Sequence, residues 1–495
     1  MKLLSIATLD RVVPPIARPP YDPRSVGIGI VHLGIGAFHR AHQAIYTDDA
    51  LEQKGGAWGI CGVSLRSADV RDRMTPQDGL YTAVEKSPAG VQRRIIGSVR
   101  EVLFLGEERE KIDARLVDPA TQIVTLTVTE KGYCHDPATG RLNFAHPDIV
   151  HDLGHPNEPA SVVGLLVSAL EARRRNGVGP MTIVCCDNLP HNGRVLGGLV
   201  AAFAQARDRT LAEWIDKNAS FPSTMVDRIV PATTASDIDD NGGALGMHDA
   251  APVVFEPFKQ WVIEDEFVTR RPAWELGGAE FVADVAPFEA MKLRLLNASH
   301  SAFAYLGFLA GHEYIYQVAA QPEFVAFMRR FMNDEVTPTL EIPASVDVAA
   351  YRDALIRRFA NPVLPHRTQQ IAMDGSQKLP QRLLATARDN LSAVRPMPLL
   401  TLAVAGWMRY VAGRDEQGRS IKVDDPLAAQ FATIAAAHRD NPRGLASGLF
   451  GLRAIFGDDL GRDPRFVEPV TTWLEALHAD GAARTVARAV ATQKS

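Results

Sequence analysis

The chain has 495 residues, 46% of them hydrophobic, which is enough to fill the cores of two or more domains. A formal net charge of −5 excludes the basic excess of a nucleic-acid-binding protein, and no apolar run is long enough to span a membrane. The four cysteines lack the CxxC spacing of a metal site and the pattern of a disulfide framework. These features predict a cytoplasmic protein that acts on a small molecule, without a nucleic-acid or membrane partner.

A glycine turn follows the first predicted strand. Residues 1–26 are rich in proline and predict an irregular lead-in. From Gly27 an apolar run leads to Gly34 and Gly36 and then to a helical pattern, as in the strand, turn and helix of a dinucleotide-binding unit. These glycines permit a tight turn and let backbone N–H groups approach a pyrophosphate. His39 stands where the common GxGxxG pattern has its third glycine, which places the closest helix-to-strand packing in question.

The second predicted strand, Trp58–Ser67, ends next to an acidic residue. Asp69 lies just beyond this end, where a carboxylate can bind the ribose hydroxyls of an adenosine. The same residue could instead be an ordinary helix N-cap. Arg66 beside it could accommodate the 2′-phosphate of NADP. We therefore expect NAD as the cofactor, with NADP less favoured.

Two later strands, 121–134 and 181–193, flank an amphipathic helix that ends at Gly177, which gives the βαβ alternation of a parallel sheet. In an open parallel sheet the ligand lies beyond the carboxyl ends of the strands. The polar residues at these two ends should therefore border the cofactor. They are Thr129, Glu130, Lys131, Asp187 and Asn188.

Two further segments complete this half of the chain. Asp227 and Arg228 lie in the apolar stretch 221–234, where they predict either a buried ion pair or a contact with a ligand. The stretch 253–268 predicts one more strand, which closes the half.

From Pro287 onward the pattern is helical, with apolar residues at helical spacing and proline or glycine between the segments. The predicted fold class is α/β, with an N-terminal Rossmann-like NAD-binding domain over residues 1–286. A mostly α-helical C-terminal domain over residues 287–495 follows, and we expect it to carry substrate-binding and catalytic residues.

The helix that begins at this boundary carries three chemically capable side chains, Lys292, Asn297 and His300. At about 100° per residue, these three and Glu289 share one side of a helix. A lysine in a low-dielectric cleft can act as a general base near neutral pH, and an amide and an imidazole can stabilise an oxygen that gains negative charge. Spacing alone also fits a buried helix whose polar residues bridge its neighbours.

Five motifs occur in one order: GIGAFHRAHQ, TLTVTEKGYC, CDNLPHNG, TMVDRIVP and the K-x4-N-x2-H spacing from Lys292 to His300. With them the chain resembles the mannitol dehydrogenase family, the long-chain, zinc-independent polyol and sugar-acid dehydrogenases, over nearly its whole length. The stretches QWVIEDEFV and HRTQQIAMDGSQKLPQR are most similar to the fructuronate reductase (D-mannonate oxidoreductase) branch.

The resemblance implies a role for each matching residue. Lys292 would be the general base in oxidation and the acid in reduction, while Asn297 and His300 polarise and orient the reacting oxygen. The residues that it implies for holding NAD are Gly34, Gly36, Phe38 and Asp69. Those that it implies for lining the substrate cleft are Asn188, Asp227, Glu289 and Lys378.

The substrate remains open between a sugar acid and a polyol. The mannitol branch has an arginine where this chain has Gln370, which places a simple hexitol in question. A sugar acid needs a cation for its carboxylate, and Arg367 or Lys378 could supply it, although both, like His366, could be surface or capping residues. We expect reversible oxidation of D-mannonate to D-fructuronate, with mannitol, sorbitol or arabinitol as alternative substrates.

Two other classes of protein need consideration. A non-catalytic NAD sensor would have no use for the Lys292 group. His39 and His42 suggest a metal-dependent hydrolase, but no acidic or cysteine ligands join them at a suitable spacing, so we expect no metal. The sequence is compatible with a monomer and with a homodimer.

Overall fold

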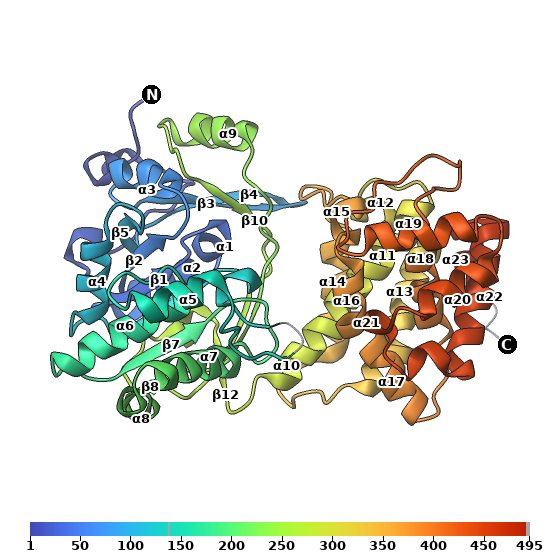
Figure 1. The fold of residues 1–495 in the computed structure, drawn as a ribbon. Coiled ribbons are helices and arrows are strands. Elements are labelled where there is room, and N and C mark those ends of the chain that lie inside the picture. The colour runs from blue at the N-terminus through green and yellow to red at the C-terminus, as the bar shows by residue number, and fades with distance from the viewer. Residues whose placement is uncertain (137–138, 492–495) are drawn as a thin grey trace. The chain divides into compact units, whose positions relative to one another are not determined.

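The computed structural model describes residues 1–136 and 139–491, without the side chains of Glu130 and Lys131. The chain divides into two compact units, Met1–Ala286 and Pro287–Ser495 (Figure 1). Within the described ranges, no helix is both long enough and apolar enough to cross a membrane.

A six-stranded parallel sheet forms the centre of the first unit (Figure 1). Its spatial order is β5-β2-β1-β6-β7-β8, and every neighbouring pair is parallel. The strand order reverses between β1 and β6, which makes their carboxyl ends the topological switch point of the sheet. The strands are β1 (Ile28–Leu33), β2 (Gly59–Ser64), β5 (Val99–Phe104), β6 (Ile123–Leu126), β7 (Met181–Cys185) and β8 (Ala219–Ser220).

Side chains alternate across this sheet and fill a core on each of its faces. Val31 and Leu33 of β1 belong to the core cluster that α4, α6 and α7 cover. Ile30 points the other way, into a second cluster that contains residues of α2 and Trp261. The helices of this unit are α1 (Ala37–Ala41), α2 (Gln43–Lys54), α3 (Asp69–Met74), α4 (Arg109–Val117), α5 (Pro147–Gly154), α6 (Val162–Arg175), α7 (Asn192–Arg207), α8 (Arg209–Asn218) and α9 (Ala235–Leu245).

Two three-stranded sheets pack beside the main sheet. One has the order β10-β3-β4 and the other β12-β11-β9. Their strands are β3 (Tyr81–Ser87), β4 (Gly90–Ile96), β9 (Thr224–Asp227), β10 (Val253–Phe255), β11 (Gln260–Glu264) and β12 (Glu280–Val282). The β3–β4 hairpin and β5 are elements that the sequence analysis did not identify.

Several predicted strands are shorter in the structure than the sequence suggested. The prediction of a single strand over 253–268 is wrong, because the chain leaves the sheet of β10 after Phe255 and enters the sheet of β11 at Gln260. Pro257 lies in the interruption, where its missing N–H prevents continuous strand pairing. The strand predicted over 121–134 ends at Leu126, and the chain then turns into a 3₁₀ helix, Glu130–Tyr133.

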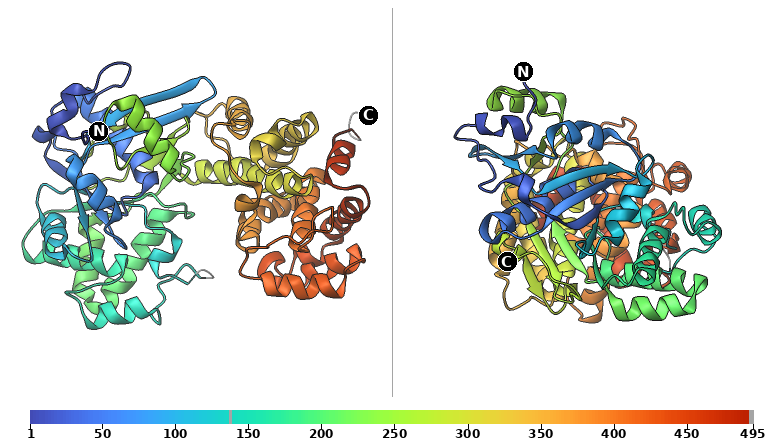
Figure 2. Two further views of the ribbon diagram at one scale, coloured as in Figure 1. Left: turned by 90° about the horizontal axis from the view of Figure 1, so that it is seen from above. Right: turned by 90° about the vertical axis from the view of Figure 1, so that its left-hand side faces the viewer.

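The second unit consists of helices (Figures 1 and 2). At its centre α18 (Pro398–Val411) is buried on all sides from Leu399 to Val411, as expected of an apolar helix inside a bundle, and it packs on α11 and α22. The other helices are α10 (Ala286–Met291), α11 (Ala298–Leu309), α12 (Ile315–Ala319), α13 (Pro322–Arg330), α14 (Val348–Phe359), α15 (Thr368–Ala372), α16 (Gly375–Leu379), α17 (Ala385–Ser392), α19 (Ala428–Ala437), α20 (Pro442–Phe450), α21 (Arg453–Phe456), α22 (Pro464–Asp480) and α23 (Ala482–Ala491).

Short helices of other types complete the secondary structure. Among residues 287–491, three segments are π-helical: Lys292–Asn297, Phe331–Val336 and Pro380–Leu384. The remaining 3₁₀ helices are Ile6–Arg11, Pro23–Ser25, Thr75–Gln77, Trp274–Gly277, Thr337–Thr339 and Leu460–Arg462. The predicted fold class, a Rossmann-like α/β unit followed by a helical unit, is confirmed.

Candidate active site

The glycine turn lies at the switch point of the sheet. Gly34 has φ +98°, and a Cβ at this position would lie 2.2 Å from the carbonyl oxygen of Thr127, so only glycine fits. The Thr127 N–H donates to Leu33 at 2.9 Å, which places the loop after β6 directly against the turn. Gly36 has ordinary φ, and its Cβ would meet only the Gly34 oxygen at 3.8 Å. Gly36 therefore leaves room for a ligand to approach the start of α1.

His39 stands where the third glycine is missing, and its side chain makes the contact between α1 and β1. Its ring stacks on that of His32 in β1, with centroids 3.4 Å apart and an angle of 15° between the planes. His32 in turn contacts the hydroxyls of Thr125 and Thr127 at 2.7 and 2.9 Å. Burial lowers the pKa of His32 to about 3 and the pKa of His39 well below 6.5. Because both rings are flat and neutral, they stack closely. This stacking lets α1 pack on β1 without a glycine at position 39.

The other predicted cofactor residues of this region lie near the same edge of the sheet. Phe38 is half-buried and stacks on His42, with ring centroids 5.0 Å apart. Asp69 is exposed as the first residue of α3, beyond the end of β2, and accepts the Ser67 hydroxyl at 3.2 Å. The N-cap of α3 is Ala68, so Asp69 does not occupy the capping position that was its alternative interpretation.

Asp187 joins the carboxyl ends of β6 and β7. Its carboxylate accepts the N–H groups of Val128 and Thr129 at 2.8 and 2.9 Å and the Tyr133 hydroxyl at 2.5 Å. Burial raises its pKa despite these donors. Thr129 and Asn188 are exposed at these strand ends, and the side chain of Glu130 lies outside the described part of the chain.

Arg228 holds three segments of the first unit together. Its guanidinium donates to the carbonyl oxygens of Ala41 at 2.8 Å and Glu256 at 3.0 Å and lies 3.8 Å from the centre of the Phe255 ring. Burial lowers its pKa to about 10. These contacts make Arg228 a structural cation, while Asp227 is buried at the end of β9.

In the second unit Lys292 and Asn297 are the first and last residues of a π-helical segment. Because a π turn is wider than an α turn, the prediction of a regular α-helix with about 100° per residue is wrong between these two positions. Within the segment both Leu295 and Leu296 are buried, and Arg294 bonds to Asp389 at 2.5 Å. π-helical turns occur frequently at functional sites.

His300 follows this segment in α11, and its Nε2 atom is buried without a hydrogen-bond partner among the described residues. The centroid of its ring lies 5.2 Å from that of the Phe359 ring and 5.6 Å from that of the His366 ring. Burial holds the pKa of His300 well below 6.5, and nearby positive charge lowers it further. The imidazole is therefore neutral and can donate or accept one hydrogen bond. The cations that supply this positive charge are Arg382, Arg358 and Lys378, whereas burial lowers the pKa of the neighbouring His366 below 6.5.

The three cations of this group come from α14, which carries Arg358, and from α16 and the π-helical segment that follows it, which carry Lys378 and Arg382. Arg382 donates to the Asn297 carbonyl oxygen at 3.3 Å and to the Ser301 hydroxyl at 3.0 Å. The Lys378 ammonium donates to the Met373 carbonyl oxygen at 2.5 Å. The sequence analysis did not select Arg358 or Arg382, since neither carries a motif signal of its own.

Arg367 has a different environment. Its side chain is 60% exposed and pairs with the Glu313 carboxylate at 2.5 Å. Gln370 is exposed, and Glu289 is half-buried in α10. The structure thus groups Lys378 with His300 and pairs Arg367 at the surface.

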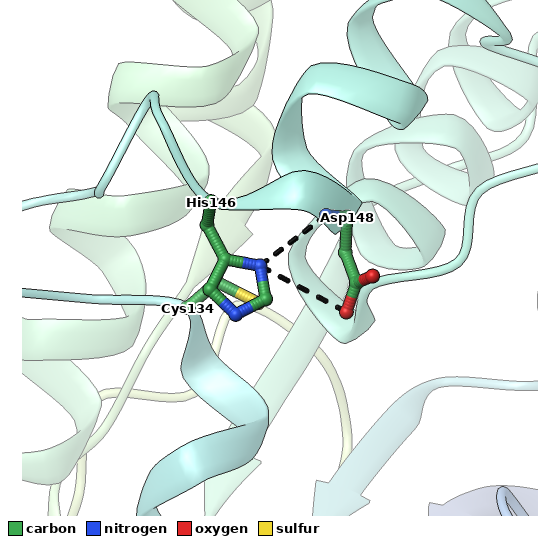
Figure 3. Close-up of side chains that lie close together, drawn as sticks. All are labelled: Cys134, His146 and Asp148. Atoms are coloured by element: carbon green, nitrogen blue, oxygen red, sulfur yellow. Dashed lines mark hydrogen bonds and ion pairs between the residues drawn. The ribbon is translucent and has the colours of Figure 1, made fainter.

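A separate cluster of possible metal ligands lies in the first unit (Figure 3). The ligand atoms of Cys134, His146 and Asp148 lie within 4.8 Å of one another. Burial raises the pKa of the Cys134 thiol to about 11, and the His146 Nδ1 atom already accepts the Asp148 N–H at 3.3 Å. Because the thiol stays protonated near neutral pH and the His146 Nδ1 atom already accepts an N–H, we assign no metal to this cluster. The sequence analysis missed the cluster because Cys134 and His146 lie in different irregular segments.

Comparison with known proteins identifies the family. The model of the mannitol dehydrogenase Rossmann domain matches residues 28–276, and that of the mannitol dehydrogenase C-terminal domain matches residues 284–478. D-mannonate oxidoreductase of Escherichia coli K12 is 48% identical over 477 residues, which cover 96% of this chain and 98% of that protein. Mannitol 2-dehydrogenase of Pyricularia oryzae is 40% identical over 481 residues, 95% of each chain.

A solved structure shows the same similarity in three dimensions. The ternary complex of Pseudomonas fluorescens mannitol 2-dehydrogenase with NAD and D-mannitol aligns with a TM-score of 0.87, at 37% identity and 100% coverage of both chains. The switch-point turn and parallel sheet define a Rossmann-like dinucleotide-binding protein. The chain belongs to the mannitol dehydrogenase family and is an oxidoreductase.

Proposed function

We propose that the protein is an NAD-dependent dehydrogenase that interconverts D-mannonate and D-fructuronate without zinc. The observation that carries this proposal is Arg382 beside the candidate catalytic residues: it donates to the Asn297 carbonyl oxygen at 3.3 Å and the Ser301 hydroxyl at 3.0 Å, and its charge, with those of Arg358 and Lys378, lowers the pKa of His300. A sugar acid carries a carboxylate, and charge-assisted hydrogen bonds to cations are among the strongest available to bind it. The 48% identity to D-mannonate oxidoreductase supports the same substrate.

The first unit fits a dinucleotide. Gly36 leaves open space in front of its backbone, and the first N–H groups of a helix have no acceptor within the helix and favour an anion. We propose that the residues that hold NAD are Gly34, Gly36, Phe38, Asp69, Thr129 and Glu130. The exposed carboxylate of Asp69 would bind the ribose hydroxyls and repel a 2′-phosphate, which favours NAD over NADP.

The second unit supplies the proton chemistry. Bound NAD would accept the hydride from the carbon that is oxidised. Lys292, in its neutral form, takes the proton of the substrate hydroxyl during oxidation and returns it during reduction. Asn297 and His300 donate hydrogen bonds to the same oxygen and so stabilise its developing negative charge. The low pKa of His300 suits this role, because a neutral imidazole orients the oxygen without surrendering a proton.

Polar side chains are the proposed substrate contacts. We propose that Asn188, Asp227 and Glu289 bind substrate hydroxyls, and that Lys378 binds the carboxylate. Arg367 remains a proposed substrate contact, although its pairing with Glu313 gives it the weaker case. A polyol such as mannitol, sorbitol or arabinitol is the alternative substrate, since mannitol 2-dehydrogenases are 40% identical to the chain.

The test is the oxidation of NADH by the purified protein with D-fructuronate, D-tagaturonate, D-fructose and D-xylulose in turn. We expect D-fructuronate to give the highest kcat/KM, and NADPH to replace NADH poorly. A preference for D-fructose or D-xylulose would assign the protein to the polyol dehydrogenases. Absence of NADH oxidation with every ketose and keto acid would overturn the proposed activity and favour a sensor of NAD.

A further inference from the structure

Thr129 has a strained backbone. Its φ of 70° and ψ of 157° lie in a region that is essentially restricted to glycine. Threonine is β-branched, so a positive φ is unfavourable for it, and the surrounding structure must hold this conformation in place. Thr129 is exposed and lies between the end of β6 and the 3₁₀ helix Glu130–Tyr133.

The Asp187 carboxylate holds the chain on both sides of this residue. One of its oxygens accepts the Thr129 N–H at 2.9 Å. The other accepts the Val128 N–H at 2.8 Å and the Tyr133 hydroxyl at 2.5 Å. Hydrogen bonds to a carboxylate are stronger than those between neutral groups. A single side chain just beyond the end of β7 thus fixes the loop before and after its strained residue.

The strained loop lies where a parallel sheet binds its ligand. Thr127, two residues earlier, donates its N–H to Leu33 at 2.9 Å and its hydroxyl to the Gly34 oxygen at 2.8 Å. The loop is therefore anchored to the glycine turn at the β1/β6 switch point. Strained residues that neighbouring structure holds in place gather at ligand-binding and active sites.

We propose that Asp187 is a positioning residue that holds the strained backbone of Thr129 at the cofactor edge of the sheet. The inference rests on the proposed NAD-dependent function and extends it to a residue without direct contact with the reacting atoms. The strain is the reason that a carboxylate is needed: without it, Thr129 relaxes toward negative φ and displaces the loop. Glycine at the same position has no such preference.

This difference between threonine and glycine provides the test. We expect Asp187→Asn to weaken NADH binding by about tenfold, as for the loss of one or two charge-assisted hydrogen bonds. Thr129→Gly alone removes any contact that the threonine side chain makes with the cofactor, so its NADH affinity is the reference for the double variant. In the double variant the affinity should stay within about twofold of Thr129→Gly, because the loop no longer needs to be held.

Asp152 offers a matched control in the same unit. Its carboxylate also accepts two consecutive N–H groups, those of Ala160 and Ser161 at 2.6 and 2.9 Å, and the Ser161 hydroxyl at 2.6 Å. Neither Ala160 nor Ser161 has a positive φ. Asp152→Asn should therefore lower stability without weakening NADH binding. If Asp187→Asn does not fold, Tyr133→Phe removes one donor to the same carboxylate and is tested in its place.

Two measurements separate this proposal from the proposed activity. NADH affinity by fluorescence requires no turnover, and amide hydrogen exchange at Val128 and Thr129 requires no cofactor. Without cofactor, we expect exchange at these two amides to be slow in wild type and fast in Asp187→Asn. Additive effects of the two substitutions, or unchanged affinity in Asp187→Asn, would overturn the positioning role. Lack of turnover in wild type would overturn the activity alone.

Discussion

The two units differ in what fixes the positions of their candidate functional groups. In the first unit the backbone sets the geometry: the positive φ of Gly34, the carboxyl ends of β1 and β6, and the N–H groups that Asp187 accepts. In the second unit side chains on helices set it, grouped around His300. Backbone positions bind but carry no proton chemistry, whereas lysine and histidine do. We therefore expect substitutions at the glycine turn and the Asp187 loop to change cofactor affinity, and those at Lys292 and around His300 to change turnover or substrate affinity.

Among the substitutions that test this difference between the units, we expect the largest loss of activity from Lys292→Ala. Removal of a general acid–base group costs about 10²-fold to 10⁴-fold in rate. Lys292→Ala should lose that much kcat in the reduction of D-fructuronate while its NADH affinity stays within about twofold of wild type. A parallel loss of NADH affinity would break the division, because it would assign Lys292 a role in cofactor binding.

We expect the next largest effects on NADH binding at the two glycines of the turn, of which only the first should also lower stability. Gly34→Ala places a Cβ 2.2 Å from the Thr127 oxygen and should lose both stability and NADH binding. Gly36→Ala has room for its Cβ and an ordinary φ, so it should keep wild-type stability and still bind NADH about tenfold or more weakly, since the methyl group fills the space in front of the turn. Thermal unfolding and NADH fluorescence distinguish these outcomes. Wild-type NADH affinity in Gly36→Ala would show that the cofactor does not approach there.

A smaller effect should separate the two predicted cations of the second unit. Lys378→Met should raise the KM for D-fructuronate about tenfold, the loss expected for a charge-assisted hydrogen bond. Arg367→Met should change it less than about twofold, because an exposed ion pair contributes little. Steady-state kinetics with neutral D-fructose serve as the control. Because this ketose carries no carboxylate, neither variant should raise its KM. A larger effect at Arg367 would reverse the assignment.

The smallest effect on activity is expected at Glu335, which lies in the helical core. Its buried carboxylate accepts the N–H groups of Leu399 and Leu400 at 2.8 and 2.7 Å. Burial raises its pKa from 4.5 to about 8. The folded protein therefore binds a proton more tightly than the unfolded chain, and the free energy of unfolding should fall as pH rises from about 4.5 to about 8.

Glu335→Gln cannot ionise and should lose this part of the pH dependence while kcat at neutral pH stays unchanged. Urea unfolding of both proteins across the same pH range measures the difference. Parallel curves for wild type and variant would show that Glu335 does not titrate in that range.

The sequence predicted the parts of the site that follow from a repeated pattern. Gly34, Gly36 and the polar residues after β6 and β7 were predictable because alternation of strands and helices fixes which strand ends share an edge. The change to helices after Ala286 was visible in the spacing of apolar residues.

The parts that it did not predict depend on irregular backbone or on long-range contacts. The π-helical turn from Lys292 to Asn297 leaves no mark in a pattern read at α-helical spacing. The stacking of His39 on His32 required the pairing of α1 with β1, and the grouping of Arg358 and Arg382 with His300 required the packing of three helices. The strain at Thr129 is a property of the backbone alone.

The central claim, that Lys292 transfers the proton, is tested most directly by chemical rescue. Reduction of NAD with D-mannonate by Lys292→Ala would be measured with increasing methylamine at several pH values, so that the concentrations of neutral amine and methylammonium vary separately. We expect a rate that rises with the neutral amine and is absent when a quaternary ammonium salt replaces it. Turnover of Lys292→Ala at the wild-type rate without any amine would contradict the account, because the proton would then have another acceptor.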